Sequence, residues 1–417
     1  DSSVTSTGTL TNASGGQIRT NAGNFTLSVQ ALTNNASLIS HSGTGLFDVD
    51  VSAILNNQSA TIVSSGGVDL DTNTLNNTGT GLLFAATNFD LHTVGNLINA
   101  GTIESLSQVN LGAAALTNTG ILSALGAQAA ATNVISISGD LNNNGGLIQS
   151  AAGHLNLTST GQHIYNQAGR IFHTGTGSLN LSAAGNIFNN SGGAFADGFG
   201  IRSLGAINQT ATVLNNSGSY LIANGATLLN ARANLVNDSG MISSAGQLTL
   251  HANTGLSNIS GTIIGNSTAK AIVDGGSGIN NQAGSISLNA THADLIAGTG
   301  SINNRSGVLV HSGAGNLDIT ASEIDNSGGN FLSSGRINWL SFNNLINTTL
   351  GSVRAVFQAE HLELTGHSGT TVNNQGGLLY ATGPASLNLT AGSVNNTSGS
   401  VISVGAANIN VASMLND

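Results

Sequence analysis

The sequence has little of what most folded chains use to mark their surfaces and turns. Of its 417 residues only 6% are charged and 4% aromatic, and there is one proline and no cysteine. Without cysteine the chain has neither disulfide bonds nor thiolate metal sites. A cysteine-free chain is also compatible with export in an unfolded form through an oxidising compartment.

Positive charge is especially scarce. The chain has 8 Lys and Arg against 18 Asp and Glu, which gives a net charge of -10. This balance argues against nucleic acid or anionic membrane as a partner. No run of 18 apolar residues is present, so we expect no segment to insert into a membrane. The first residues show no signal-peptide pattern, which indicates a mature or excised chain.

Glycine, asparagine, serine and threonine fill the space between aliphatic residues. Glycine alone accounts for 57 positions, and hydrophobic residues make up 39%. The polar residues are weak helix formers, whereas the aliphatic content and low charge exclude ordinary disorder. We therefore expect a β-structure whose core consists of small and branched side chains.

A degenerate repeat runs through the chain. Its anchor is an apolar residue, any residue and an asparagine, at intervals of about 19 to 27 residues that average about 22. This period lies in the range of solenoid proteins. The anchor asparagines are Asn12, Asn34, Asn57, Asn77, Asn99, Asn118, Asn143, Asn166, Asn189, Asn216, Asn237, Asn258, Asn281, Asn304, Asn326, Asn347, Asn374, Asn396 and Asn416.

Each repeat also holds a short apolar–polar–apolar alternation before its anchor, such as Leu155-Asn156-Leu157. Period two predicts a strand with one buried face. Stacking each strand on its equivalent in the next repeat satisfies the backbone and buries a continuous core. We predict an all-β, right-handed parallel β-helix of about 19 coils, because parallel crossovers favour that hand. Stacked anchors would form a ladder of side-chain amides.

Two other repeat folds fit less well. Leucine-rich repeats share the period, but only the stretch from Leu248 to Leu256 approaches their consensus. Left-handed helices of hexapeptides require intervals in multiples of six, which this chain does not supply.

Units such as LNNNGGLIQSAAGHLNLTS (141–159) and INNRSGVLVHSGAGNLDIT (302–320) resemble the repeats of filamentous haemagglutinin, the shaft of large two-partner-secretion exoproteins. The resemblance covers essentially the whole chain. It implies a secreted protein at a Gram-negative cell surface, exported through an outer-membrane transporter. It implies adhesion to a receptor or glycan on a host or neighbouring cell or, alternatively, a shaft or receptor-binding part of a contact-dependent growth inhibition effector.

The chain departs from that family in lacking the N-P-N motifs of its secretion domain, since Pro384 is its only proline. We therefore expect residues 1–417 to be one continuous segment of a longer filament. Irregular intervals predict looser coils or protruding loops near 119–142, 190–215 and 336–373.

Acidic residues recur at equivalent positions in the early repeats. Asp48, Asp69 and Asp90 precede their anchors by 8 or 9 residues, and Asp50 and Asp71 form a second set with His92. Stacked carboxylates repel, so either they take up protons more easily or a cation such as calcium lies between them. The simpler alternative is a solvated acidic stripe.

Two stretches combine aromatic residues with arginine, the composition of interface centres. The alternative is that their aromatic rings fill a locally wider core. The candidate partner-binding residues are Phe195, Phe199, Arg202, Arg336, Trp339, Phe342, Arg354 and Phe357.

Parallel β-helices also host polysaccharide-processing enzymes, which need acids paired with other acids or with basic groups in one cleft. The acids here are spread out and have few basic partners. We expect a non-enzymatic shaft or adhesin segment with no catalytic residue, no cofactor and, apart from the acidic ladder, no metal.

Overall fold

The computed structural model describes residues 1–190, 200–384 and 387–417, which belong to two compact units, Asp1–Thr212 and Val213–Asp417. The chain folds as an all-β parallel solenoid of about 18 turns with about 22 residues per turn, as the repeat predicts. Nineteen anchors enclose eighteen intervals, which accounts for the difference from the nineteen coils expected. Among the described residues, no helix is long and apolar enough to cross a membrane.

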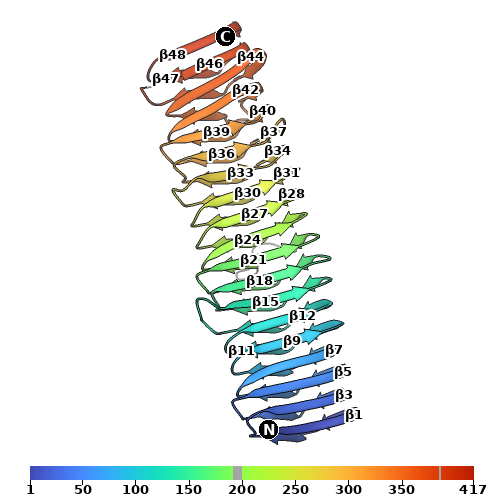
Figure 1. The fold of residues 1–417 in the computed structure, drawn as a ribbon. Helices are drawn as coiled ribbons and strands as arrows, with labels where there is room; N and C mark the ends of the chain where they lie inside the picture. The colour runs from blue at the N-terminus through green and yellow to red at the C-terminus, as the bar shows by residue number, and fades with distance from the viewer. Residues whose placement is uncertain (191–199, 385–386) are drawn as a thin grey trace. The chain divides into compact units, whose positions relative to one another are not determined.

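Each coil contributes strands to two parallel sheets. One coil of the second unit runs through β36 (Ala293–Ile296), β37 (Ser301–Asn303) and β38 (Val308–His311). The first two strands belong to sheet A, on either side of a bend, and the third belongs to sheet B. Within each unit, equivalent strands of successive coils lie side by side (Figure 1).

In the first unit, the sheet A strands are β1 (Ser2–Ala13), β3 (Phe25–Asn35), β5 (Leu46–Gln58), β7 (Gly67–Thr78), β9 (Phe89–Thr93), β10 (Asn96–Asn99), β12 (Val109–Ala113), β13 (Ala115–Asn118), β15 (Thr132–Ile137), β16 (Leu141–Asn142), β18 (His154–Ser159), β19 (Ile164–Tyr165), β21 (Ser178–Ala183), β22 (Ile187–Phe188) and β24 (Ala206–Ala211). Its sheet B strands are β2 (Gln17–Thr20), β4 (Leu38–His41), β6 (Thr61–Ser64), β8 (Leu82–Ala85), β11 (Thr102–Ser105), β14 (Ile121–Ala124), β17 (Leu147–Ser150), β20 (Arg170–His173) and β23 (Gly200–Ser203).

In the second unit, the remaining sheet A strands are β25 (Leu214–Asn215), β27 (Thr227–Ala231), β28 (Asn234–Val236), β30 (Leu248–Ala252), β31 (Gly255–Ser257), β33 (Ala271–Asp274), β34 (Gly278–Asn280), β39 (Asn316–Thr320), β40 (Glu323–Asp325), β42 (Arg336–Ile346), β44 (His361–Asn373), β46 (Leu387–Asn395) and β48 (Ala407–Leu415). The remaining sheet B strands are β26 (Tyr220–Ala223), β29 (Met241–Ser244), β32 (Thr262–Gly265), β35 (Ser285–Leu288), β41 (Asn330–Ser333), β43 (Val356–Ala359), β45 (Leu378–Ala381) and β47 (Ser400–Ser403).

The alternation seen in the sequence places one face of each strand in the core. Equivalent inward residues form columns that run from coil to coil, such as Leu295, Ile319, Trp339 and Leu364, all of them buried. Branched and aliphatic side chains suit such columns because each one packs on a similar side chain above and below. The outward residues of the same strands are free to carry polar groups.

The anchor asparagines form the predicted amide ladder within each unit. The Asn281 side chain is fully buried and donates to Asn304 Oδ1 at 2.7 Å. It also reaches the backbone oxygens of Gly284 and Val308, at 3.3 and 3.2 Å. The ladder therefore adds a side-chain donor to the corner carbonyl of Gly284, which also accepts from the Val308 N–H at 2.8 Å.

The corner after each anchor explains why small residues and glycine follow it. The Gly284 N–H donates to the Asn281 oxygen at 3.0 Å, and Ala283 between them has a φ of 53°. A positive φ at the third residue of such a turn favours glycine or a small residue. A side chain at Gly284 would overlap the carbonyl oxygen of Asn258 in the preceding coil. The anchor asparagine, with the small residues and glycine that follow it, thus encodes one turn.

Candidate functional site

The acidic residues of the early repeats lie in one outward column of sheet A. The strand registers align Asp48 with Asp69 and Asp69 with Asp90, so the equivalence predicted from their spacing is confirmed. The column continues with Asn110, whose amide donates to Asp90 Oδ1 at 2.7 Å. One side of this acidic ladder is therefore relieved by a neutral amide.

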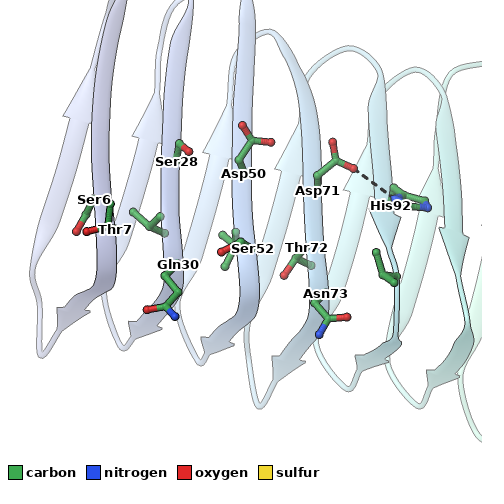
Figure 2. Close-up of a pocket in the computed structure, with 13 residues that line it drawn as sticks. Ser6, Thr7, Ser28, Gln30, Asp50, Ser52, Asp71, Thr72, Asn73 and His92 are labelled. Carbon is green, nitrogen blue, oxygen red and sulfur yellow. Dashed lines mark ion pairs between the residues drawn. The ribbon is translucent and has the colours of Figure 1, made fainter.

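A second column lies two residues further along the same strands. Asp50 aligns with Asp71, and Asp71 aligns with His92. His92 Nδ1 lies 3.5 Å from Asp71 Oδ1, and both side chains are more than half exposed (Figure 2). Exposed pairs of this kind contribute little to stability.

The second column, Asp50, Asp71 and His92, borders an open groove of about 870 Å³ at the bend of the first coils. It forms where β1, β3 and β5 pass through the bend as single strands whose registers shift. Hydroxyl, amide, carboxylate and imidazole side chains line its length, and Figure 2 shows them projecting from successive strands. These groups are Ser6, Thr7, Ser28, Gln30, Asp50, Ser52, Asp71, Thr72, Asn73 and His92. The groove is thus an open trough, and the apolar side chains of Val29, Val51 and Val94 lie among these polar groups.

Burial and mutual repulsion raise the pKa values of the central carboxyls. The pKa of Asp48 is raised by burial and by the charges of Asp50 and Asp71. The pKa of Asp69 is raised by burial and by Asp71, Asp90, Asp48 and Asp50. Easier protonation is one of the two outcomes expected for stacked carboxylates.

The acidic ladder does not bring three ligand atoms together. Across residues 1–190, 200–384 and 387–417, the one group of three His or carboxylate side chains with ligand atoms within 4.8 Å of one another is His292, Asp294 and Asp318. A cation on the early ladder would have at most two carboxylates as direct ligands in this arrangement. Calcium usually takes six to eight oxygen ligands.

The aromatic residues proposed for partner binding in the second unit lie in the core. Trp339, Phe342 and Phe357 are fully buried, so none of them contacts a partner from this position. Trp339 stacks on Phe342 at 4.0 Å, and its Nε1 donates to the Ala321 oxygen at 2.9 Å. Phe357 stacks on Phe331 at 4.7 Å. These rings therefore fill the core, as the alternative expects, rather than an exposed interface.

Arg336 belongs to a polar cluster centred on Glu363. Arg336 Nη2 lies 2.9 Å from Glu363 Oε2, and Asn388 donates to the same oxygen at 2.8 Å. Burial opposes ionisation of this carboxyl, but bonds from Asn388, His361 and Thr365 and the charge of Arg336 hold its pKa below the ordinary value. A carboxylate stabilised in this way is a poor general acid.

Arg354 is exposed next to a small protruding turn. Leu350 and Val353 pair with each other through two backbone hydrogen bonds, with Gly351 at a φ of 60° between them. Both apolar side chains are exposed. Arg354 Nη2 donates to Ser400 Oγ at 2.7 Å and to the Gly377 oxygen at 3.0 Å, so its guanidinium is held beside the turn. We call residues 347–355 the display turn.

The other aromatic stretch is only partly described. Phe195 and Phe199 lie outside the described residues. Arg202 is exposed on β23, and its guanidinium lies 5.8 Å from the centre of the Phe172 ring in the preceding coil. Arg202 therefore packs against the surface of its own sheet.

One repeated site was missed from the sequence. His41, His173 and His311 are buried, and in each the Nδ1 atom faces a serine of the next coil at 2.9 to 3.0 Å. Each Nε2 lies 2.8 to 3.0 Å from a backbone carbonyl, which fixes the proton on Nε2. The signal was present as HSGTG (41–45), HTGTG (173–177) and HSGAG (311–315). Their burial makes these His–Ser pairs structural.

Comparisons with known proteins identify no relative. No family profile matches the chain, and searches of curated proteins and of solved structures give no significant match. The solenoid with its asparagine ladder therefore stands on the strand registers and side-chain contacts described above.

Proposed function

We propose that this chain is a non-enzymatic structural segment of a secreted, cell-surface filament that mediates adhesion. The observation that carries the proposal is the asparagine ladder, in which each coil is the template for the next. In the first unit, for example, Asn57 donates to Asn77 and Asn77 to Asn99, each at 2.8 Å. A stack built in this way extends by adding coils without changing its cross-section, which suits a shaft that holds binding elements away from a surface.

The polar exterior supports a role in display rather than in chemistry. Side-chain amides on the outward face also join neighbouring coils, as where Asn180 donates to Asn156 and Asn208 to Asn180, each at 2.7 Å. In these ladders the outward amides form hydrogen bonds with one another between coils, which leaves fewer of their groups to bind a partner. Such a surface resists unintended association while its protruding elements make specific contacts.

The display turn is the element of the second unit best suited to bind a receptor. Leu350 and Val353 supply exposed apolar contacts beside the fixed guanidinium of Arg354. Interfaces commonly centre on arginine and apolar residues that are already positioned. The partner would be a protein receptor or glycan on a host or neighbouring cell.

A bacterial surface location is supported by the resemblance to filamentous haemagglutinin repeats and by the absence of cysteine. A chain without cysteine passes through an oxidising compartment without forming disulfides that would block threading. During export the partner would be an outer-membrane transporter of a Gram-negative cell.

Binding of the labelled chain to host cells and to Gram-negative cells would test the proposal. Saturable binding to host cells, with an affinity at least tenfold lower in Arg354→Ala, supports adhesion through the display turn. Arg202→Ala provides a matched control, because Arg202 packs on its own sheet. Binding restricted to Gram-negative cells would favour the shaft of a growth-inhibition effector instead. Saturable binding to neither cell type, or turnover of a polysaccharide, would refute the proposal.

A further inference from the structure

The second unit contains a cluster in which two carboxylates of adjacent coils face one imidazole. Asp294 on β36 and Asp318 on β39 are register partners in an outward column of sheet A. His292 precedes Asp294 by two residues and so projects from the same face. His292 Nε2 lies 2.9 Å from Asp294 Oδ1 and 3.2 Å from Asp318 Oδ2.

The other oxygen of each carboxylate is held by a neighbouring coil. Lys270 Nζ lies 2.6 Å from Asp294 Oδ2, and Asn338 Nδ2 donates to Asp318 Oδ1 at 2.7 Å. Both carboxylates are thereby oriented with one oxygen toward the imidazole nitrogen. Metal ligands are commonly fixed by outer contacts of this kind.

His292 Nε2, Asp294 Oδ1 and Asp318 Oδ2 are better arranged to bind a metal ion than to form hydrogen bonds with one another. A single N–H group points in one direction, so it cannot make two linear hydrogen bonds to Asp294 and Asp318. We propose that His292, Asp294 and Asp318 bind a divalent transition-metal ion such as zinc, and that water completes its coordination.

The spacing and chemistry of the cluster agree with this proposal. Ligand atoms about 2.1 Å from an ion lie about 3.0 to 3.4 Å apart when they are neighbours, close to the two measured nitrogen–oxygen distances. The side chains of His292, Asp294 and Asp318 are 35%, 20% and 40% exposed, which leaves solvent access on the outer side. One imidazole with two carboxylates favours zinc, cobalt, nickel or manganese over calcium.

The second unit also offers a natural comparison. His251 Nδ1 lies 2.7 Å from Asp274 Oδ2, and its other ring nitrogen is bonded to Asn253 at 2.7 Å. This His–Asp pair has a similar exposed position but only one carboxylate. His251→Asn therefore removes a comparable imidazole without touching the three-ligand cluster.

Titration of the full, tag-free chain with zinc chloride tests the proposal by calorimetry, and cobalt absorption spectra report the ligand set. We expect one ion per chain, a loss of affinity of at least tenfold in His292→Asn and Asp318→Asn, and no change in His251→Asn. Asn338→Ala, which removes an outer contact, should weaken binding about 10- to 100-fold. Circular dichroism of each metal-free variant establishes that the fold is retained.

Three results would overturn the proposal. The first is the absence of zinc binding tighter than about 1 mM in the unmodified chain. The second is equal affinity in the unmodified chain and in both folded ligand variants. The third is an equal loss in His251→Asn and His292→Asn, which would indicate general binding to surface histidines. If one ligand variant fails to fold, the other decides the outcome.

Discussion

Removing one amide from the inner ladder should destabilise the solenoid far more than removing its outward neighbour. In Asn281→Ala, Asn304 Oδ1 loses its donor and Asn258 Nδ2 loses its acceptor. Asn258 keeps weaker contacts with the oxygens of Gly261 and Ser285 at 3.2 and 3.1 Å. With each unsatisfied buried group costing about 1–3 kcal/mol, we expect a loss of about 2–4 kcal/mol in the free energy of unfolding.

Asn281→Asp should have a larger effect at neutral pH. The introduced carboxylate can still accept from Asn258 but would face the oxygens of Asn304 and Val308, to which the native amide donates. A buried charge without a partner costs about 3–5 kcal/mol. The loss should diminish as pH falls, because a protonated carboxyl can donate to one of these oxygens.

Asn280→Ala is the matched control, since Asn280 is the same residue type one position away and points outward. Its Oδ1 accepts from Asn303 Nδ2 at 3.1 Å and from the Gln282 N–H at 3.2 Å, but water can replace both bonds at this partly exposed position, so we expect a loss of no more than about 1 kcal/mol in the free energy of unfolding. Urea denaturation gives the energies, and hydrogen exchange locates the weakened coils, because interactions in a solenoid are mostly between neighbours. Equal effects of Asn280→Ala and Asn281→Ala would refute the reasoning.

Four further predictions follow from the same contacts. Gly284→Ala should lower the melting temperature sharply because the added methyl group overlaps the preceding coil. Ala283→Gly, at a positive φ, should be neutral or stabilising by about 0.5–1 kcal/mol. A greater loss of stability in Ala283→Gly than in Gly284→Ala would contradict the turn described above. Burial lowers the pKa of His311 from its ordinary 6.5, so the folded imidazole is neutral, and the stability that it contributes should be full above that pH and decrease below it. His311→Gln should reduce the dependence of the urea midpoint on pH. An unchanged dependence would count against the buried site. Because the pKa of Asp69 is raised by burial and neighbouring carboxylates, Asp69→Asn should stabilise the chain at pH 7 and lose this advantage below about pH 3.8. High salt should reduce the part of the gain that comes from repulsion but not the part that comes from burial, so a gain wholly independent of salt would exclude repulsion. Trp339→Ala should cost about 3–5 kcal/mol in thermal or urea unfolding without weakening receptor binding of the folded fraction, and a selective loss of binding would restore Trp339 as a contact residue.

The coil and its ladders could be predicted from the sequence because both depend on local repetition. The spacing of Asn281 and Asn304 establishes the amide ladder, and the same counting aligns Asp48 with Asp69. A repeated position in a parallel solenoid is also a repeated position in space. Counting anchors therefore gives the register as well as the fold.

The side-chain clusters were harder to predict because they depend on direction as well as on spacing. The prediction that Trp339 binds a partner depends on its residue type alone, although the alternation Ile337-Asn338-Trp339 already indicates that it points inward. His292 and Asp318 meet across neighbouring coils only because one side chain lies two positions before the aligned column. Aligning only the equivalent positions of successive repeats does not reveal such diagonal contacts.

Cross-linking across neighbouring coils is the most direct test of the in-register stack, and the cysteine-free chain provides a clean background. Ser287 and Val310 are outward register partners in β35 and β38, whereas Ser287 and Val308 are displaced by two residues. Parallel neighbours are about 4.8 Å apart, within the range for a disulfide, and the displaced pair is about 8 Å apart, beyond it. We predict that the double variant Ser287→Cys/Val310→Cys forms an intramolecular disulfide on mild oxidation and that Ser287→Cys/Val308→Cys does not. Preferential cross-linking of the displaced pair, or equal cross-linking of both, would contradict the stacked register on which the whole account depends.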